Sequence, residues 1–277
     1  LEPVSSKYIS NVVSVADIDN KNLKVKVGTQ NTTSSDVVQI VLKEQNTIVA
    51  MTKGVVGETL ELALADVKLW SPESPFLYDL EVTLLDKGKK TDKVKSYAAM
   101  RKISMHKDKD GIMRMQLNNK DCFQFGPLDQ GWWPDGLYTA PTDEALAYDI
   151  EKTKDWGFNM IRKHIKVEPA RWYTHCDRLG ILVWQDMPSG DNSPKWIQYN
   201  YFDGKENERS IESEENFKKE WREIMDYLMP YPSIVVWVPF NEAWGQFKTK
   251  EIAEWTEYYD PSRLVNAASG GNHYTCG

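Results

Sequence analysis

The 277 residues are enough for two domains, and 41% hydrophobic with 27% charged residues is the balance of an ordinary globular protein. The chain carries 34 Lys and Arg against 41 Asp and Glu, a net charge of −7, whereas nucleic-acid and anionic-membrane partners require clustered positive charge. We therefore expect no nucleic acid and no membrane as a partner, and no apolar run approaches the roughly 18 residues that cross a bilayer.

Residues 1–105 are predicted to form an immunoglobulin-like β-sandwich. In Tyr78–Leu84 the even positions are apolar and the odd positions polar, the period of two that is typical of a half-buried strand. Similar runs cover Leu23–Val27, Val37–Glu44 and Thr59–Leu64, and no helical pattern of useful length separates them. About 105 residues with several such strands match the size of an immunoglobulin-like domain.

A change in charge near residue 105 predicts a domain boundary. Residues 1–105 hold 14 basic and 13 acidic residues, which leaves 20 basic and 28 acidic residues for the remainder. The segment Met105–Met115 is charged and turn-like, as expected of a connection between domains. The second domain is therefore predicted to cover residues 106–277.

Residues 106–277 alternate strands with helices, which predicts parallel βα units. Five strands are predicted, at Cys122–Phe125, Phe158–Ile165, Ile181–Asp186, Ser233–Glu242 and Leu264–Ser269. Four helices are predicted between them, from Thr142 to Gly157, from Pro169 to Gly180, around Phe217–Leu228 and around Ile252–Tyr259. A doubly wound sheet and a (β/α)8 barrel both fit this pattern. Because a complete barrel takes about 250 residues, five units would form an incomplete one.

In parallel α/β folds the functional site lies where strands end. Polar and aromatic side chains gather at these ends, namely Asp129–Trp133, Arg162, His164, Gln185, Asp186, Asn241, Glu242, Trp244 and Ser269–His273. Ten of the 11 Trp residues follow residue 130. Trp stacks on the C–H faces of sugar rings, while carboxylates and amides bind hydroxyls, so the set indicates a carbohydrate site. Trp is also a core residue, and core packing is the alternative for each.

Three motifs here resemble glycoside hydrolase family 2, which includes β-galactosidases, β-mannosidases and β-glucuronidases. They are LWSPESPFLYDLEV, GFNMIRKHIKVEPARWYTHCDRLGILVWQD and PSIVVWVPFNEAWGQ. The resemblance runs from about residue 65 to the C-terminus, and Asn241–Glu242 is its most specific element. It implies an immunoglobulin-like sandwich followed by a (β/α)8 barrel, usually after a sugar-binding jelly-roll. On that basis this chain holds the sandwich and the first five barrel units.

The resemblance also implies roles for individual residues. Glu242 matches the general acid/base carboxylate, and Asn241 matches the neighbour that hydrogen-bonds the substrate 2-hydroxyl. Arg162 matches an Arg below the catalytic carboxylates, and Asp186 an acidic residue that contacts the sugar. The nucleophile of the family is a Glu after the seventh strand, so none is expected in this chain. Retaining glycosidases need both carboxyl groups, about 5–5.5 Å apart.

Alternatives stay open at several of these positions. Arg162 and Asp186 are read either as part of the sugar site or as a structural ion pair. His164 follows Arg162 by two positions where relatives often have three, and a core histidine is the other interpretation. Trp133 is expected either at the rim of the site or in loop packing. Trp244, with Phe240, is expected to give Glu242 the apolar surround that a proton donor needs near neutral pH.

The function expected is that of a retaining exo-β-glycosidase, β-galactosidase-like or related, acting on a carbohydrate substrate. The alternative is a non-catalytic carbohydrate-binding or interaction module, and a Glu ending a seventh strand would discriminate the two. The four His and three Cys residues have no metal-ligand spacing, so neither metal nor cofactor is expected. Without a nucleophile the chain alone is expected to be inactive, and open barrel edges predict self-association. No signal peptide is visible, although a periplasmic or secreted parent fits the resemblance.

Overall fold

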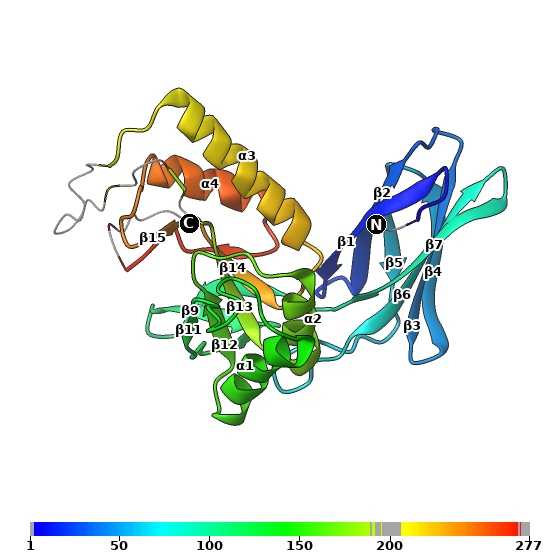
Figure 1. The fold of residues 1–277 in the computed structure, drawn as a ribbon. Coiled ribbons are helices and arrows are strands. Elements are labelled where there is room, and N and C mark those ends of the chain that lie inside the picture. The colour runs from blue at the N-terminus through cyan, green and yellow to red at the C-terminus, as the bar shows by residue number, and fades with distance from the viewer. Residues whose placement is uncertain (1–2, 189, 192–194, 196–205, 271, 273–277) are drawn as a thin grey trace. The chain divides into compact units, whose positions relative to one another are not determined.

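The computed structural model describes residues 3–188, 190–191, 195, 206–270 and 272. Two compact units make up the chain (Figure 1). The first comprises Leu1–Lys102 with Leu117–Lys120, and the second comprises Ile103–Gln116 with Asp121–Gly277. Each unit has its own cluster of buried hydrophobic residues.

The first unit is a β-sandwich of two antiparallel sheets, as predicted. One sheet has the order β1-β2-β5, with β1 at Tyr8–Asp17, β2 at Asn22–Gln30 and β5 at Thr59–Ala63. The other has the order β4-β3-β6-β7, with β3 at Val37–Glu44, β4 at Thr47–Val55, β6 at Tyr78–Asp86 and β7 at Lys89–Ala98. The alternation in β6 is confirmed, since Tyr78, Leu80, Val82 and Leu84 are at most 1% exposed.

Three strands of the sandwich have no counterpart among the predicted runs: β1, β4 and β7. All three lie at the edge of a sheet. β4 contains no fully buried residue, and β1 and β7 contain one each. A strand that buries little has little reason to alternate apolar and polar residues, so the period of two is weak in these three strands.

The charged segment expected to connect the domains forms a β-hairpin. It consists of β8 (Ile103–Lys107) and β9 (Met113–Leu117), and the short β10 (Lys120–Asp121) pairs with β9. The carboxylate of Asp108 closes the turn by accepting hydrogen bonds from the backbone N–H groups of Asp110 and Ile112, at 2.9 Å each. The bond from Ile112 and the guanidinium of Arg114 lower the pKa of Asp108.

The second unit contains a parallel sheet whose five strands follow one another in chain order. They are β11 (Leu128–Asp129), β12 (Met160–Lys163), β13 (Leu182–Asp186), β14 (Ile234–Val238) and β16 (Leu264–Val265). A short parallel pair, β15 (Phe240–Asn241) with β17 (Ala268–Ser269), follows β14 and β16. A doubly wound sheet would reverse its strand order at a switch point. The described sheet has no reversal, as expected for part of a (β/α)8 barrel.

Four helices accompany this sheet in the described residues. They are α1 (Asp143–Asp155), α2 (Ala170–Leu179), α3 (Ile211–Leu228) and α4 (Thr249–Tyr259). The predicted ends of α1 and α2 are confirmed: the Thr142 side chain accepts from Ala145 N at 3.1 Å, and Gly180 ends α2 in the left-handed conformation. The helix was predicted to start at Pro169. In the structure Pro169 is the N-cap of α2, one position before its first helical residue.

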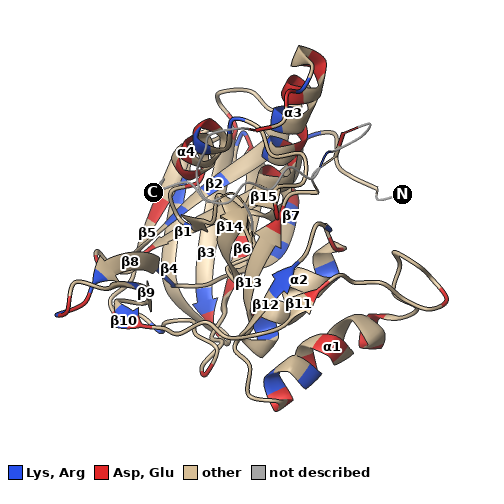
Figure 2. Ribbon diagram, turned by 90° about the vertical axis from the view of Figure 1, so that its left-hand side faces the viewer, with Lys and Arg blue, Asp and Glu red and all other residues tan. Residues whose placement is uncertain are grey.

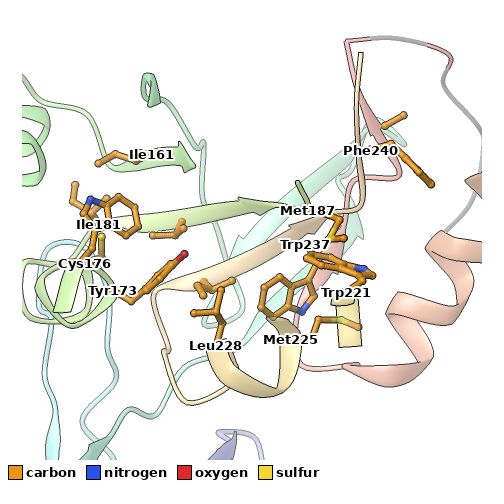
Figure 3. Packing of buried hydrophobic residues seen from close by; sticks show 14 of the residues in the cluster. Ile161, Tyr173, Cys176, Ile181, Met187, Trp221, Met225, Leu228, Trp237 and Phe240 are labelled. Atoms are coloured by element: carbon orange, nitrogen blue, oxygen red, sulfur yellow. The ribbon is translucent and has the colours of Figure 1, made fainter. Parts of the chain in front are cut away.

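Large aromatic side chains form the core between sheet and helices. Trp221 of α3 meets Trp237 of β14 edge-on, with ring centroids 5.5 Å apart, and both are fully buried (Figure 3). Tyr173 and Cys176 of α2 belong to the same cluster. Three of the Trp residues after position 130, namely Trp172, Trp221 and Trp237, are therefore core residues.

The predicted first strand at Cys122–Phe125 is wrong. Phe123 and Phe125 are 82% and 59% exposed; they stack on each other, and Phe125 also packs on Phe158. The pairing with β12 is assigned three residues further on, where Leu128 lies opposite Arg162. The apolar residues of Cys122–Phe125 predicted a strand there, but contact with β12 decides which residues pair.

Candidate functional site

The pleat of the parallel sheet separates two rows of side chains. Arg162, Trp184 and Val236 are in register on neighbouring strands and share one face. Lys163 and Gln185 belong to the other row, and the ammonium of Lys163 lies 4.2 Å from the ring centre of Trp172 in α2. The helices therefore cover the Lys163 row, and the Arg162 row faces the interior of the barrel.

At the carboxyl ends of the strands, three predicted site residues meet through hydrogen bonds. Arg162 Nε and Nη2 donate to the two carboxylate oxygens of Asp186, at 3.0 and 2.7 Å. Nη2 also donates to Asn241 Oδ1 at 2.7 Å. These residues lie on β12, β13 and β15, and 79 positions separate Arg162 from Asn241. We call Arg162, Asp186 and Asn241 the strand-end trio.

Asp186 is the most buried member of the strand-end trio, with no exposed side-chain surface. Burial raises the pKa of Asp186, while the Arg162 guanidinium and the backbone N–H of Ile165, 3.2 Å from Oδ2, act in the opposite direction. Arg162 retains 14% side-chain exposure. The trio is thus a largely buried, charge-assisted network, open to solvent only on one side.

Glu242 directly follows the trio in the chain and is exposed. Its backbone N–H donates to Ser269 O at 2.7 Å, which ties it to the end of β17. Gly270 lies beside it: a Cβ at that position would stand 3.4 Å from Glu242 Cγ and 3.7 Å from Oε1. Phe240 is not its apolar cover, since that ring stacks on Phe217 within the core. Trp244 is 42% exposed.

The loop after β11 carries the remaining predicted residues. Trp133 is half-buried, forms a bridge with Leu137, and its indole N–H is buried without a partner in the described structure. Trp132 is 60% exposed and meets Tyr138 edge-on. His164 is half-buried rather than a core residue, with Nδ1 3.5 Å from the side-chain amide of Gln130. Residues 271 and 273 of the predicted Ser269–His273 end lie outside the described residues.

A second, largely buried network on the helix side of β12 was not predicted from the sequence. Lys163 Nζ lies 2.6 Å from Asp129 Oδ2 and 2.9 Å from Glu168 Oε1. Lys166 Nζ lies 2.8 Å from the same Glu168 oxygen and donates to Gly131 O at 2.6 Å. Both lysine side chains are 1% exposed. The segment KHIKVE resembles an exposed charged segment. The only sign in the sequence that these charges are buried is the position of the segment, between a buried strand and a helix preceded by proline.

Two cavities of the second unit lie apart from the strand-end trio. One of about 540 Å³ is lined by the interior-facing Trp184 and Val236 and by Met105, Met113 and Met115 of the hairpin. The other, about 550 Å³, lies between the loop after β11 and α1. Neither is lined by a member of the trio or by Glu242.

The geometry agrees with comparisons to known proteins. The sequence-family model of glycosyl hydrolases family 2 matches residues 7–101. The sequence-family model of the family 2 TIM barrel domain matches residues 138–275. The chain belongs to glycosyl hydrolase family 2. The two matches fall on the sandwich and on the parallel sheet with its helices.

Curated relatives carry two kinds of name. A beta-galactosidase of Lactococcus lactis is 26% identical over 77% of this chain and 20% of its own length. A putative beta-glucuronidase of Formosa agariphila is 28% identical over 83% of this chain and 25% of its own. The chain thus spans a fifth to a quarter of the curated relatives it matches.

Solved structures of similar fold include a beta-D-glucuronidase of Dictyoglomus thermophilum, with a TM-score of 0.78 and 20% identity. That match covers 94% of this chain and 44% of the other. The FMN-binding beta-glucuronidase of Faecalibacterium prausnitzii L2-6 gives a TM-score of 0.75 at 19% identity, over 95% of this chain and 41% of the other. The sandwich and partial barrel predicted from the sequence are confirmed.

In the described part of the chain, no group of three His, Cys, Asp or Glu side chains is placed to hold a metal ion. None of the helices found in the described ranges has the length and apolar character to cross a membrane.

Proposed function

We propose that this chain is part of a retaining exo-β-glycosidase in which Glu242 is the general acid/base. The observation that carries the proposal is the exposed Glu242 placed directly after the buried strand-end trio. Family 2 proteins named for galactosides and glucuronides are its relatives. A glycosidase needs one carboxyl group that can reach the glycosidic oxygen and polar groups that hold the sugar. Glu242 and the trio supply both.

The hydrogen bonds of the trio give each member a defined task. Asn241 Oδ1 accepts from Arg162, so its amide nitrogen is left as a donor, which suits the 2-hydroxyl of the sugar. Arg162 donates to both carboxylate oxygens of Asp186. Because Oδ2 also accepts from Ile165 N, only Oδ1 keeps a lone pair for a sugar hydroxyl. Glu242 then protonates the departing oxygen and later activates water. His164, Trp133 and Trp244 are proposed to line the sugar site.

The nucleophile is proposed to come from a later strand of the barrel. The resemblance puts it after a seventh strand, and the described sheet has five. We therefore propose that residues 1–277 alone do not hydrolyse glycosides. The sugar is proposed to be a terminal β-galactoside or a related β-glycoside, and self-association through the sheet edges stays a prediction.

The test compares Glu242→Gln with the unchanged protein, in an active protein that contains this chain. Substrates with poor leaving groups should lose about 10²–10⁴-fold in rate, because they need the proton that Glu242 supplies. Activated aryl β-glycosides should lose much less in glycosylation, because their leaving groups depart unprotonated. Equal, small losses on both substrate classes would remove Glu242 from the role and favour a non-catalytic carbohydrate-binding module. Residues 1–277 alone, assayed in parallel, should give no turnover.

A further inference from the structure

The turn that follows Glu242 has an unusual backbone. Glu242, Ala243 and Gly245 have φ angles of 49°, 67° and 58°, all in the left-handed region. Residues other than glycine rarely adopt it, and they do so where the surrounding structure leaves no alternative. Trp244 N donates to Asn241 O at 2.9 Å, which closes the turn. The direction of the Glu242 side chain therefore depends on whatever holds this turn in place.

Arg209, just before α3, binds the turn through two hydrogen bonds from its side chain. Its Nε and Nη2 both donate to Gly245 O, at 3.1 and 2.7 Å. Its Nη1 donates to Gly190 O at 2.7 Å, in the loop after β13. One guanidinium thus joins the segment that follows Asp186 to the segment that follows Glu242.

The position of Arg209 is itself fixed by packing. The guanidinium carbon lies 4.5 Å from the ring centre of Phe247 and 5.2 Å from that of Phe217. Both rings are buried, at 1% and 2% exposure, and burial lowers the pKa of Arg209 from its ordinary value. A planar fork with several donors can bind a carbonyl through two N–H groups while stacking on a ring, which a lysine ammonium cannot reproduce.

Asn207 also holds this turn, but it binds the carbonyl of Gln246 rather than that of Gly245. Asn207 N and Nδ2 donate to Gln246 O, at 2.7 and 3.2 Å. Arg209 acts one residue closer to Glu242. Loss of its fork should leave the turn attached at Gln246 O, at Glu242 N through Ser269 O and at Gly245 N through Lys195 O. The Gly245 carbonyl would then lose its side-chain donors, which allows the backbone of residues 243–245 to shift.

We propose that Arg209 is a positioning residue for Glu242, fixing the left-handed turn that aims the Glu242 carboxylate at the departing glycosidic oxygen. The inference rests on the proposed function. It extends that function to a side chain outside the barrel strands, which acts through its hydrogen bonds to the backbone of the turn.

The test is Arg209→Lys in an active protein that contains this chain, assayed on β-glycosides whose leaving groups span poor to activated. A shift of about 1 Å in a catalytic group costs up to about 100-fold. We expect kcat on poor leaving groups to fall about 10- to 100-fold, with KM nearly unchanged and activated aryl glycosides affected far less. The alkaline limb of the pH–rate profile should move, because the rate falls there when the proton donor loses its proton.

Arg263→Lys is the matched control. Arg263 also donates to main-chain carbonyls, those of Ile234, Met229 and Tyr231, and its guanidinium lies 5.4 Å from the ring centre of Trp237. It sits at the amino end of β14, away from Glu242 in the chain and at the opposite end of the strand. This variant should lower the melting temperature without any dependence on the leaving group.

A loss in Arg209→Lys that is equal for all leaving groups, or no loss, overturns the inference. If Arg209→Lys does not fold, Phe247→Leu decides, since it removes one of the two rings beneath the guanidinium. That ring also meets Phe217 and Phe240 edge-on, so only the dependence of the loss on the leaving group is compared. A smaller loss confined to poor leaving groups supports the inference, and a uniform loss overturns it. Glu242→Gln separates the two proposals. If Glu242→Gln loses rate mainly on poor leaving groups but Arg209→Lys does not, only the positioning role of Arg209 is defeated. Absence of the effect in Glu242→Gln defeats the proposed function.

Discussion

The two units of the chain place their charged side chains differently. In the sandwich, Glu81 of β6 pairs with Lys43 and Lys93 on the surface, and all three side chains keep 19–33% exposure. In the barrel section, Lys163 and Glu168 are at most 2% exposed, and β12 carries two adjacent basic residues within the sheet (Figure 2). The sandwich core consists of apolar residues.

This difference has an energetic meaning. Taking an ion pair out of water costs about as much as the pair returns, so buried charges are a poor way to stabilise a fold. Directed hydrogen bonds do, however, fix the geometry of the groups that they join. The barrel section keeps buried ions at the strand ends around Arg162 and Lys163, where geometry matters for a site. The sandwich, without such a site, leaves most of its ion pairs partly exposed, although Asp36, which pairs with Lys7, is buried.

Lys163→Met should have the largest effect on stability. The change leaves Asp129 and Glu168 without one of their ammonium partners, and breaking a buried pair costs about 3–5 kcal/mol. Urea unfolding followed by Trp fluorescence measures it, because ten of the 11 Trp residues follow position 130 and report on the second unit. A loss below about 1 kcal/mol, the range of surface pairs, would break the comparison.

A smaller effect is expected from acid. Burial would raise the pKa of Asp260, but Arg263 and hydrogen bonds from Ser262 and Trp237 together lower it to about 2. A carboxyl with a lowered folded pKa stabilises above its unfolded value near 3.8 and loses that contribution as the pH falls to about 2. The second unit should therefore lose on the order of 2 kcal/mol across this window.

Asp260→Asn tests the assignment. The variant starts less stable, because Arg263 loses its charged partner, but its unfolding free energy should change less between pH 4 and pH 2. The measurement is urea unfolding by Trp fluorescence at several pH values in this range. An identical pH slope in both proteins would assign the acid sensitivity to other groups.

Lys93→Met should have the smallest effect. Lys93, and then Lys43, hold the pKa of Glu81 down at about 2, yet the pair is on the surface, where water and salt screen it. Hydrogen exchange of the β6 and β7 amides should hardly change, and any change should vanish in high salt. Marked loss of protection in β6 would mean that the sandwich also depends on its ions.

Local features of the sequence predicted much of the fold. Three of these features depend only on residues close together in the chain, so the sequence alone predicts them. They are the period of two in Tyr78–Leu84, the helix cap at Thr142 and the helix end at Gly180. Of the site, the sequence indicated Arg162 and Asp186 and left open whether they are a sugar site or an ion pair. The structure supports an ion pair that also reaches Asn241. Lys166 and Arg209 were missed, because nothing local marks a charge as buried.

By itself, the sequence determined the order and kind of the elements, since propensity, caps and periodicity are properties of neighbouring residues. Tertiary structure alone decided which strand pairs with β12, which of Arg162 and Lys163 faces the barrel interior, and which carbonyls Arg209 binds. The pleat sends adjacent residues to opposite faces, so one step in register would exchange the roles of Arg162 and Lys163. That register is set by contacts between segments 24 to 79 residues apart.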